Sequence, residues 1–328
     1  MFRRNKNRVV AIEMNDYVIR GLITQDSDLE TAKVYEYALP PGVIVDEVLV
    51  DELTFFEILK SLVKDWNISR HDLRFFVPDH SVMMRTFDHP KELTSNELKG
   101  YVEMELGRTI HLPFENPLLD VYDHEEGDGE AVIYASSSEE VVKVMQLYHD
   151  INLNPKILDV RMLSIIRFLK TIDYFNSENT YLVADWSINA LSISIYSNEN
   201  VDFLRYHSVE TPNRSWKYAP DLLDINVFTY DGEIEEYKMS LSEQVLEVER
   251  ILNFYRFSFH KGEKSVDQIV LVGENPEMPY IKEQLEGTTD MPVEIVDDAF
   301  VRQHYKELNR KHVALIGLSL KEEDSLGS

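Results

Sequence analysis

The sequence predicts an α/β protein built from two related halves, and three observations lead to this fold class. Residues 9–23 and 181–196 each show a strand, a turn with a carboxylate (Glu13 or Asp185), and a second strand with alternating apolar residues. Amphipathic helices and further short strands follow both hairpins. At 328 residues the chain also exceeds the usual size of one compact core. Because Asp and Asn favour turns for local reasons, two such hairpins also arise by chance, and this alternative stays open.

Composition excludes several classes of protein. Hydrophobic residues make up 44% and aromatic residues 11% of the chain, which is enough to form a sizeable core. A net charge of −26 repels phosphate backbones, so we expect no nucleic-acid partner. The chain has no cysteine, which excludes disulfides and cysteine-based zinc sites.

The N-terminus carries the one basic patch, formed by Arg3, Arg4, Lys6 and Arg8. It is either a contact with an anionic membrane face or a solvated tail. The first apolar run is short and contains Glu13, and no stretch approaches ~18 apolar residues, so we expect neither a signal peptide nor a membrane span. The resulting expectation is a soluble cytoplasmic protein.

Two capping boxes mark helix starts in the first half of the chain. Thr94 and Glu97 precede one helix, and Ser137 and Glu140 precede another. Apolar residues at helical spacing predict the remaining helices. The expected elements are helices within 51–68, 93–106, 139–151 and 158–172, and strands at 73–77, 81–90, 118–122 and 131–136.

The second half begins after a boundary at 173–180 and contains the longest predicted helix. Residues 242–260 carry one apolar stripe, and Gly262 fits the end of that helix. Asp231 and Gly232 predict a two-residue hairpin turn between the flanking segments 226–230 and 233–239. The remaining expected elements are a buried strand ending at Gly273, a helix after it, a strand at 292–296 and an apolar helix at 312–320.

Several segments together resemble one known family. Residues 243–257, EQVLEVERILNFYRF, are similar to an E-I-x-R-x-L-x-F-Y helix, and residues 92–121 are similar to L-x-x-x-I-x-x-E followed by I-P-F-P and L-D. Val102 and Glu105 take the I and E of the second motif, whereas His111 and Leu112 depart from it. Both motifs are typical of the PilM family, actin-like cytoplasmic proteins of type IV pilus assembly related to the division protein FtsA.

The resemblance implies an actin-like ATPase fold of two RNase-H-like domains with an FtsA-type inserted subdomain. It assigns residues 1–80, 151–178 and the C-terminal helix 312–321 to the first domain. Residues 81–150 form the inserted subdomain, and residues 179–311 form the second domain.

The nucleotide site that this fold implies is degenerate in the sequence. In the actin superfamily each half offers a D-x-G turn, whose carboxylate holds Mg²⁺ through water and whose glycine admits phosphate oxygens. Glu13 and Asn15 stand at the first turn and Asp185 and Ser187 at the second, while Gly273 matches a glycine beside adenine. Because a side chain replaces glycine in both turns, we expect weak or absent nucleotide binding, no cofactor, no catalytic residue and no enzyme activity.

A functional ATP-binding switch or small-molecule kinase is the alternative. In that case Glu13 and Asp185 hold the metal of Mg-ATP, and Gly273 and Gly317 admit the nucleotide. A kinase also needs an aspartate base above the transferred phosphate, and the sequence assigns none.

The resemblance implies attachment as the function. PilM-like proteins bind the cytoplasmic N-terminal tail of the bitopic membrane protein PilN in a groove between the insertion and the first domain. This places them at the cytoplasmic face of the cell membrane through their partners, in a pilus, competence or type II secretion-like platform. We assign the groove to Tyr101, Met104, Glu105, Ile110, Pro113 and Phe114, although such apolar residues also fit a buried core.

No metal site is expected. The acidic loop 123–130 fails the spacing of an EF-hand and is interpreted as a solvated turn. The histidines form no H-E-x-x-H motif.

Overall fold

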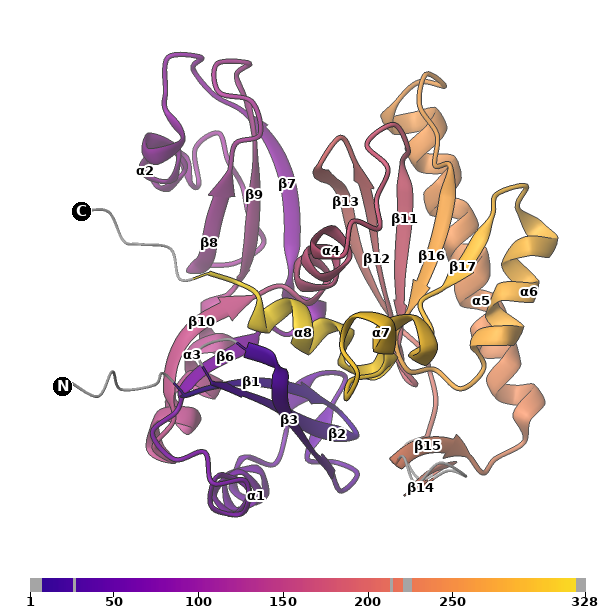
Figure 1. Cartoon of the computed structure of the whole chain (residues 1–328). Helices are drawn as coiled ribbons and strands as arrows, with labels where there is room; N and C mark the ends of the chain where they lie inside the picture. Colours follow the sequence, from indigo (N-terminus) through magenta and orange to yellow (C-terminus); the bar gives the residue numbers. More distant parts are fainter. Residues whose placement is uncertain (1–7, 26–27, 213–214, 221–225, 323–328) are drawn as a thin grey trace.

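The computed structural model describes residues 8–25, 28–212, 215–220 and 226–322, and two five-stranded sheets dominate it (Figure 1). The first consists of β1 (Arg8–Asn15), β2 (Val18–Gln25), β3 (Asp28–Ala38), β6 (Asp72–Phe76) and β10 (Asn154–Asp159). The second consists of β11 (Tyr181–Trp186), β12 (Ala190–Ser197), β13 (Asn200–Ser208), β16 (Gln268–Val272) and β17 (Val293–Ile295). We call these sheets and the helices on their outer faces the first and second lobes.

The two sheets have the same topology. The first is ordered β3-β2-β1-β6-β10, and the second is ordered β13-β12-β11-β16-β17. In each, the first three strands are antiparallel and the last two are added in parallel. The two hairpins recognised in the sequence, β1-β2 and β11-β12, therefore occupy equivalent places in the two lobes.

Helices form three layers around the sheets. Buried clusters place α1 (Glu52–Asp65) and α3 (Ser138–Asp150) against the outer face of the first sheet, and α5 (Ile234–Asn253) and α6 (Met278–Thr288) against that of the second. Between the sheets lie α4 (Arg161–Thr171) and α8 (Val313–Ser319) (Figure 1). Ala11 and Leu22 of the first sheet share one buried cluster with Val183 and Val270 of the second and with both helices. This shared core joins the lobes by apolar burial.

A three-stranded sheet forms the insertion between β6 and β10. Its strands are β7 (Met83–Asp88), β8 (Pro117–Tyr122) and β9 (Glu130–Ser137), in the order β7-β9-β8. Helix α2 (Ser95–Glu105) covers one face, where Leu98 and Val102 are fully buried against Ile133. The backbone amide of Thr94 donates to the Glu97 carboxylate at 2.9 Å, as expected for a capping box. Strand β8 lies at the edge of this sheet.

Smaller elements complete the described chain. They are the pairs β4 (Ile44–Val45) with β5 (Val48–Leu49) and β14 (Trp216–Pro220) with β15 (Asn226–Tyr230), helix α7 (Asp298–His304), 3₁₀ turns at Asp79–Ser81 and Arg310–His312, and a π-helical turn at Phe254–Phe259. None of the described helices is long and apolar enough to cross a bilayer. The basic residues Arg3, Arg4 and Lys6 lie outside the described residues.

Two predictions of local structure are wrong, and one helix is shorter than expected. The helix expected within 158–172 begins at Arg161, because the preceding residues extend β10 beside β6. Asp231 and Gly232 do not close a hairpin, since β15 pairs with the upstream strand β14 and helix α5 starts at Ile234. The longest helix therefore begins earlier than its apolar stripe indicated.

The second capping box does not form, although α3 starts at the expected place. The Ser137 side chain caps no backbone amide. The Glu140 carboxylate instead lies 3.2 Å from His80 Nε2, so it is engaged with another segment of the chain.

Candidate functional site

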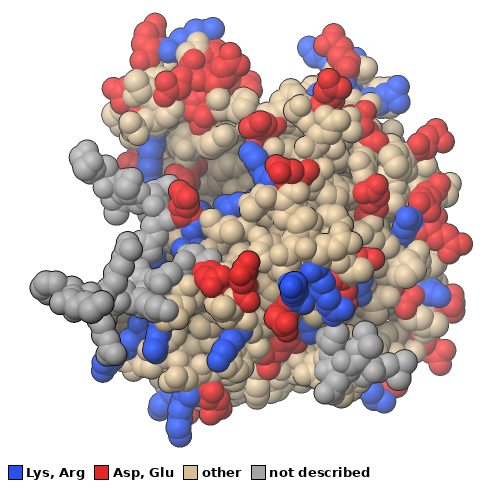
Figure 2. Space-filling model, viewed as in Figure 1, with Lys and Arg blue, Asp and Glu red and all other residues tan. Residues whose placement is uncertain are grey.

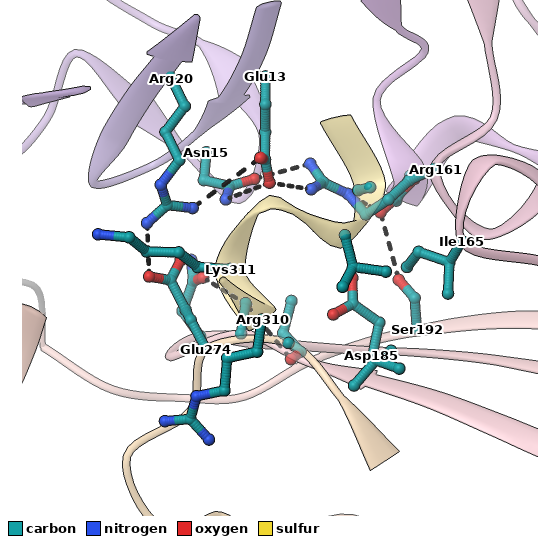
Figure 3. Close-up of a pocket in the computed structure, with 18 of the residues that line it drawn as sticks. Glu13, Asn15, Arg20, Arg161, Ile165, Asp185, Ser192, Glu274, Arg310 and Lys311 are labelled. Carbon is teal, nitrogen blue, oxygen red and sulfur yellow. Dashed lines mark hydrogen bonds and ion pairs between the residues drawn. The ribbon is translucent and has the colours of Figure 1, made fainter. Parts of the chain in front are cut away.

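A polar cleft lies between the lobes, where β1 and β11 end (Figure 3). Glu13 and Asn15 line it from the end of β1, and Asp185 and Ser187 line it from the end of β11. Gly273, directly after β16, completes this set. The equivalent topology of the two sheets therefore brings five of the six predicted cleft residues together.

Arg161 fills the middle of this cleft. It is the first residue of α4, and only 7% of its surface is exposed. Its guanidinium donates to the Asp79 carboxylate at 2.8 Å, to the Asn15 side-chain oxygen at 2.8 Å, and to the Glu13 carboxylate (Figure 3). One cation therefore joins two buried carboxylates and an amide, and such a charge-assisted network is rigid.

A second buried cation connects the two lobes. Arg20 in β2 is 1% exposed, and its Nη2 lies 2.5 Å from the carboxylate of Glu274, in the loop after β16. The Tyr17 hydroxyl donates to the same carboxylate at 2.7 Å. Arg20 also lies 3.9 Å from Glu13 and 3.5 Å from Glu36. These contacts hold the hairpin of one lobe against a loop of the other.

Two carboxyl groups of the cleft have strongly shifted pKa values. Burial raises the pKa of Asp79 to about 7, although Arg161 acts in the opposite direction. Burial likewise raises the pKa of Asp185 to about 7, again opposed by Arg161. Near neutral pH both groups are partly protonated, which weakens them as ligands for a hydrated Mg²⁺ ion.

The cleft is too small for a nucleotide in this arrangement. Its cavity volume is about 30 Å³, whereas pockets for small molecules usually have ~300–1,000 Å³. Six carboxylate and four cationic side chains line the cleft, and the Glu13 carboxylate already forms an ion pair with Arg161. The residues present therefore do not fit a Mg-nucleotide unless the lobes separate and Arg161 leaves its partners.

The glycines of the predicted site serve packing. Gly317 does not line the cleft; it lies in α8, where a Cβ would meet the backbone oxygen of Ser164 in α4. Gly273 has a φ of +99°, and a Cβ there would meet the carbonyl oxygen of Trp186. The Trp186 side chain is fully buried in the second lobe and does not obstruct the cleft.

The sequence-based prediction missed Arg20, Arg161 and Asp79. Each arginine is the single charge inside a largely apolar run, in VIRGLI and in VRMLSII. An isolated arginine inside such a run needs a buried acidic partner, and this is the signal that identifies it.

A second candidate site is an open groove between the inserted sheet and the first lobe. Its volume is about 330 Å³. Leu118 and Asp120 of the edge strand β8 form one wall, together with Tyr134 of β9. The other wall comes from β10, the start of α4 and Lys321, which donates to Asp159 at 2.9 Å.

The groove continues into a wider hollow between the insertion and the second lobe. This hollow has a volume of about 840 Å³, and Tyr122 at the end of β8 lines it. Figure 2 shows the surface hollowed between these two parts of the molecule. One face of the inserted sheet therefore borders a continuous channel.

The six predicted partner-binding residues lie on the opposite side of that sheet. Tyr101, Phe114 and the buried Ile110 pack in the core that α2 forms with the insertion. Met104 is 66% exposed and Pro113 is also exposed, whereas Glu105 accepts a hydrogen bond from Thr109. None of the six lines the groove. The helical spacing that suggested a contact surface belongs mainly to a local core.

A family model places the chain among known proteins. The model of the type IV pilus assembly protein PilM matches residues 18–210, which is more than half of the chain. The chain belongs to the PilM family. A comparison of this PilM-family sequence with functionally curated proteins found no match.

Solved structures confirm an actin-like fold for this PilM-family chain. A PilM-PilN type IV pilus biogenesis complex matches with a TM-score of 0.71 and 16% identity, over 97% of this chain and 98% of that one. A Bacteroides thetaiotaomicron protein with an actin-like ATPase fold matches with a TM-score of 0.53, 10% identity and the same coverage of both chains. MreB5 of Spiroplasma citri bound to ADP matches with a TM-score of 0.50 and 9% identity, over 95% of this chain and 94% of that one.

Proposed function

We propose that this protein is an adaptor of a type IV pilus, competence or type II secretion-like platform. In this role it binds the cytoplasmic N-terminal tail of a PilN-like bitopic membrane protein and is held at the cytoplasmic face of the membrane by that partner. Family membership and the fold shared with a PilM-PilN complex support the class of function. The observation that carries the proposal is the groove beside β8, which has the size and the open strand edge that an extended peptide needs.

The peptide is expected to bind as an added strand. Within the described chain β8 pairs only with β9, so no strand covers the backbone of its outer edge. Leu118 is 41% exposed beside this edge, and Val160 and Leu163 face it across the groove. Alternate apolar side chains of the tail would enter this space, while its backbone bonds to β8.

The charge of the insertion indicates what else the tail carries. Residues 81–150 contain 15 acidic and five basic side chains. Acidic side chains gather on the visible face of the insertion (Figure 2). A tail with basic residues beside its apolar ones would therefore associate with this surface faster than a neutral tail. Its affinity would be highest at low salt.

A peptide-binding measurement tests the groove. The probe is a fluorescently labelled peptide with the sequence of the cytoplasmic tail of the PilN-like protein from the same organism. Leu118→Asp places a charge in the apolar wall and should weaken binding at least tenfold, which corresponds to about 1.4 kcal/mol. Met104→Asp, on the α2 side of the sheet, is the matched control and should bind as the wild type does.

Two results would contradict the assignment. Unchanged affinity of the Leu118→Asp variant, with its circular dichroism spectrum intact, would exclude the groove. Weaker peptide binding in the Met104→Asp variant alone would show that the tail binds on the α2 face. Both variants replace an exposed residue, so we expect both to fold.

We infer further that the adaptor works without a nucleotide. The network of Arg161, Glu13 and Asp79 supports this, because it occupies the place between the two hairpin turns. Isothermal titration of the chain with Mg-ATP should give no heat of binding at millimolar nucleotide. A micromolar affinity would favour the alternative, an ATP-binding switch whose lobes open.

A further inference from the structure

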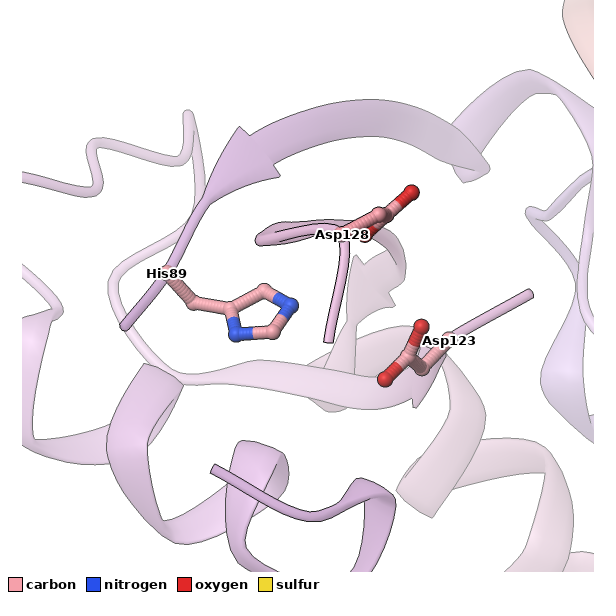
Figure 4. A group of neighbouring side chains, drawn as sticks. All are labelled: His89, Asp123 and Asp128. Carbon is pink, nitrogen blue, oxygen red and sulfur yellow. The ribbon is translucent and has the colours of Figure 1, made fainter. Parts of the chain in front are cut away.

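We propose that the outer end of the insertion holds a divalent transition metal ion, with zinc as the preferred species. The ligands are His89, which follows β7, and Asp123 and Asp128 in the loop between β8 and β9. One donor atom from each of the three lies within 4.8 Å of the other two (Figure 4). The sequence alone did not indicate this group, because His89 is far from the acidic loop along the chain.

The histidine is buried and prepared to donate a lone pair. His89 is 7% exposed. Its Nδ1 lies 2.9 Å from the carbonyl oxygen of Pro90. A carbonyl only accepts hydrogen bonds, so Nδ1 carries the proton and Nε2 of the neutral ring has a free lone pair. Nε2 is enclosed and has no hydrogen-bond partner among the described residues. A backbone carbonyl that orients the ring in this way is the usual outer partner of a metal-binding histidine.

The two carboxylates supply matching charge. Both oxygens of Asp123 are enclosed and lack a hydrogen-bond partner among the described residues. Asp128 accepts the backbone amide of Glu130 at 2.7 Å through one oxygen, which fixes the orientation of its carboxylate. An enclosed carboxylate without a partner is costly, whereas a cation beside it would remove that cost.

The backbone around the group is ordered by the sheet. β7 pairs with β9 up to Asp88 and Glu130, and the amide of His89 donates to the carbonyl of Gly129 at 2.9 Å. Gly127 and Gly129 have φ values near +90°, and they shape the loop on either side of Asp128. A small closure of the aspartate side chains brings three donors to zinc, whose bonds to nitrogen and oxygen are ~2.0–2.2 Å.

The donor set selects the class of metal. Ca²⁺ and Mg²⁺ prefer oxygen ligands alone, whereas one imidazole with two carboxylates suits zinc and its neighbours in the first transition row. Three protein ligands leave a fourth position for water. The ion would tie the loop 123–130 to the end of β7, at the rim of the 840 Å³ hollow that Asp128 also lines.

The test is isothermal titration of the full chain, stripped of metal with a chelator, against zinc chloride. We expect one equivalent to bind, and magnesium and calcium chloride to bind at least tenfold more weakly. His89→Gln should weaken zinc binding by 10–100-fold. His124→Gln is the matched control, because His124 is exposed in the same loop and does not belong to the group; it should retain the wild-type affinity.

A second variant separates metal binding from a purely structural role. Asp123→Asn should also weaken zinc binding, but without metal its thermal midpoint should equal or exceed that of the wild type, because an enclosed charge without a partner is removed. Equal zinc affinity in His89→Gln, loss in His124→Gln alone, or no zinc binding by the wild type would each overturn the proposal. A metal-free Asp123→Asn variant that is less stable than the wild type would also contradict it.

Discussion

Arg161 offers the sharpest test of how the cleft is held closed. Arg161→Met keeps much of the volume and apolar stem of the side chain and removes its charge. The three partners Asp79, Asn15 and Glu13 then lose the guanidinium, while the longer contacts of Ser192 with Asp79 and of Arg20 with Glu13 remain. Removing one side of a buried ion pair costs ~3–5 kcal/mol, because the remaining charge stays buried without a partner.

This magnitude converts into a measurable shift. For chains above about 150 residues, 1 kcal/mol corresponds to roughly 2–4 °C in the unfolding midpoint, so calorimetry should show a loss of at least about 6 °C. Arg250→Met is the control. Arg250 is 73% exposed, and among the described residues its ion-pair partner is Glu247 three residues away, so its loss should cost less than ~1 kcal/mol.

A compensating variant identifies the cause of the loss. Adding Glu13→Gln and Asp79→Asn to Arg161→Met removes the unpaired charges and should restore most of the midpoint. If Arg161→Met costs no more than Arg250→Met, or if the triple variant recovers nothing, the ion network does not hold the cleft as described.

Further predictions concern the cleft and the helix contact behind it. Asp185→Asn should leave stability at pH 4 unchanged and raise it at pH 8 by roughly 1–2 kcal/mol, measured by urea titration. The sign follows from the pKa of Asp185, which is about 7 in the folded state against 3.8 ordinarily. The protonated Asp185 carboxyl favours the folded state, and this contribution to the free energy of unfolding is lost as the pH rises from 3.8 to about 7. Gly317→Ala should lower the thermal midpoint strongly, because a Cβ there meets the backbone of Ser164. Gly100→Ala, in open space on α2, should instead raise the free energy of unfolding by ~0.5–1 kcal/mol and with it the midpoint. The reverse order of the two variants would contradict the packing described for α8.

Local patterns predicted much of the fold because they have local causes. The turns after Glu13 and Asp185 lie between strands whose alternation is visible in the sequence, and both form hairpins. Thr94 and Glu97 satisfy each other within one helical turn, so their capping box is also found. Ser137 and Glu140 have the same spacing, yet His80 from a distant segment takes the carboxylate. A capping motif is reliable only where no distant partner competes for its acid.

The candidate sites were harder to predict because their partners come from distant parts of the chain. Glu13, Asn15, Asp185, Ser187 and Gly273 were placed in the cleft through family resemblance, whereas the arginines that fill it were not recognised. For the partner groove, spacing identified apolar residues on α2 but did not show which face of the inserted sheet that helix covers. Only the strand order β7-β9-β8 and the position of α2 show that the opposite face is open.

The position of α8 in the chain has a consequence for biosynthesis. This helix completes the buried cluster between the two sheets, yet it follows every strand of the second lobe in sequence. While the polypeptide emerges from the ribosome, the apolar inner face of the amino-terminal sheet stays exposed until α8 has been synthesised. A chaperone bound to that face during translation would protect it from aggregation.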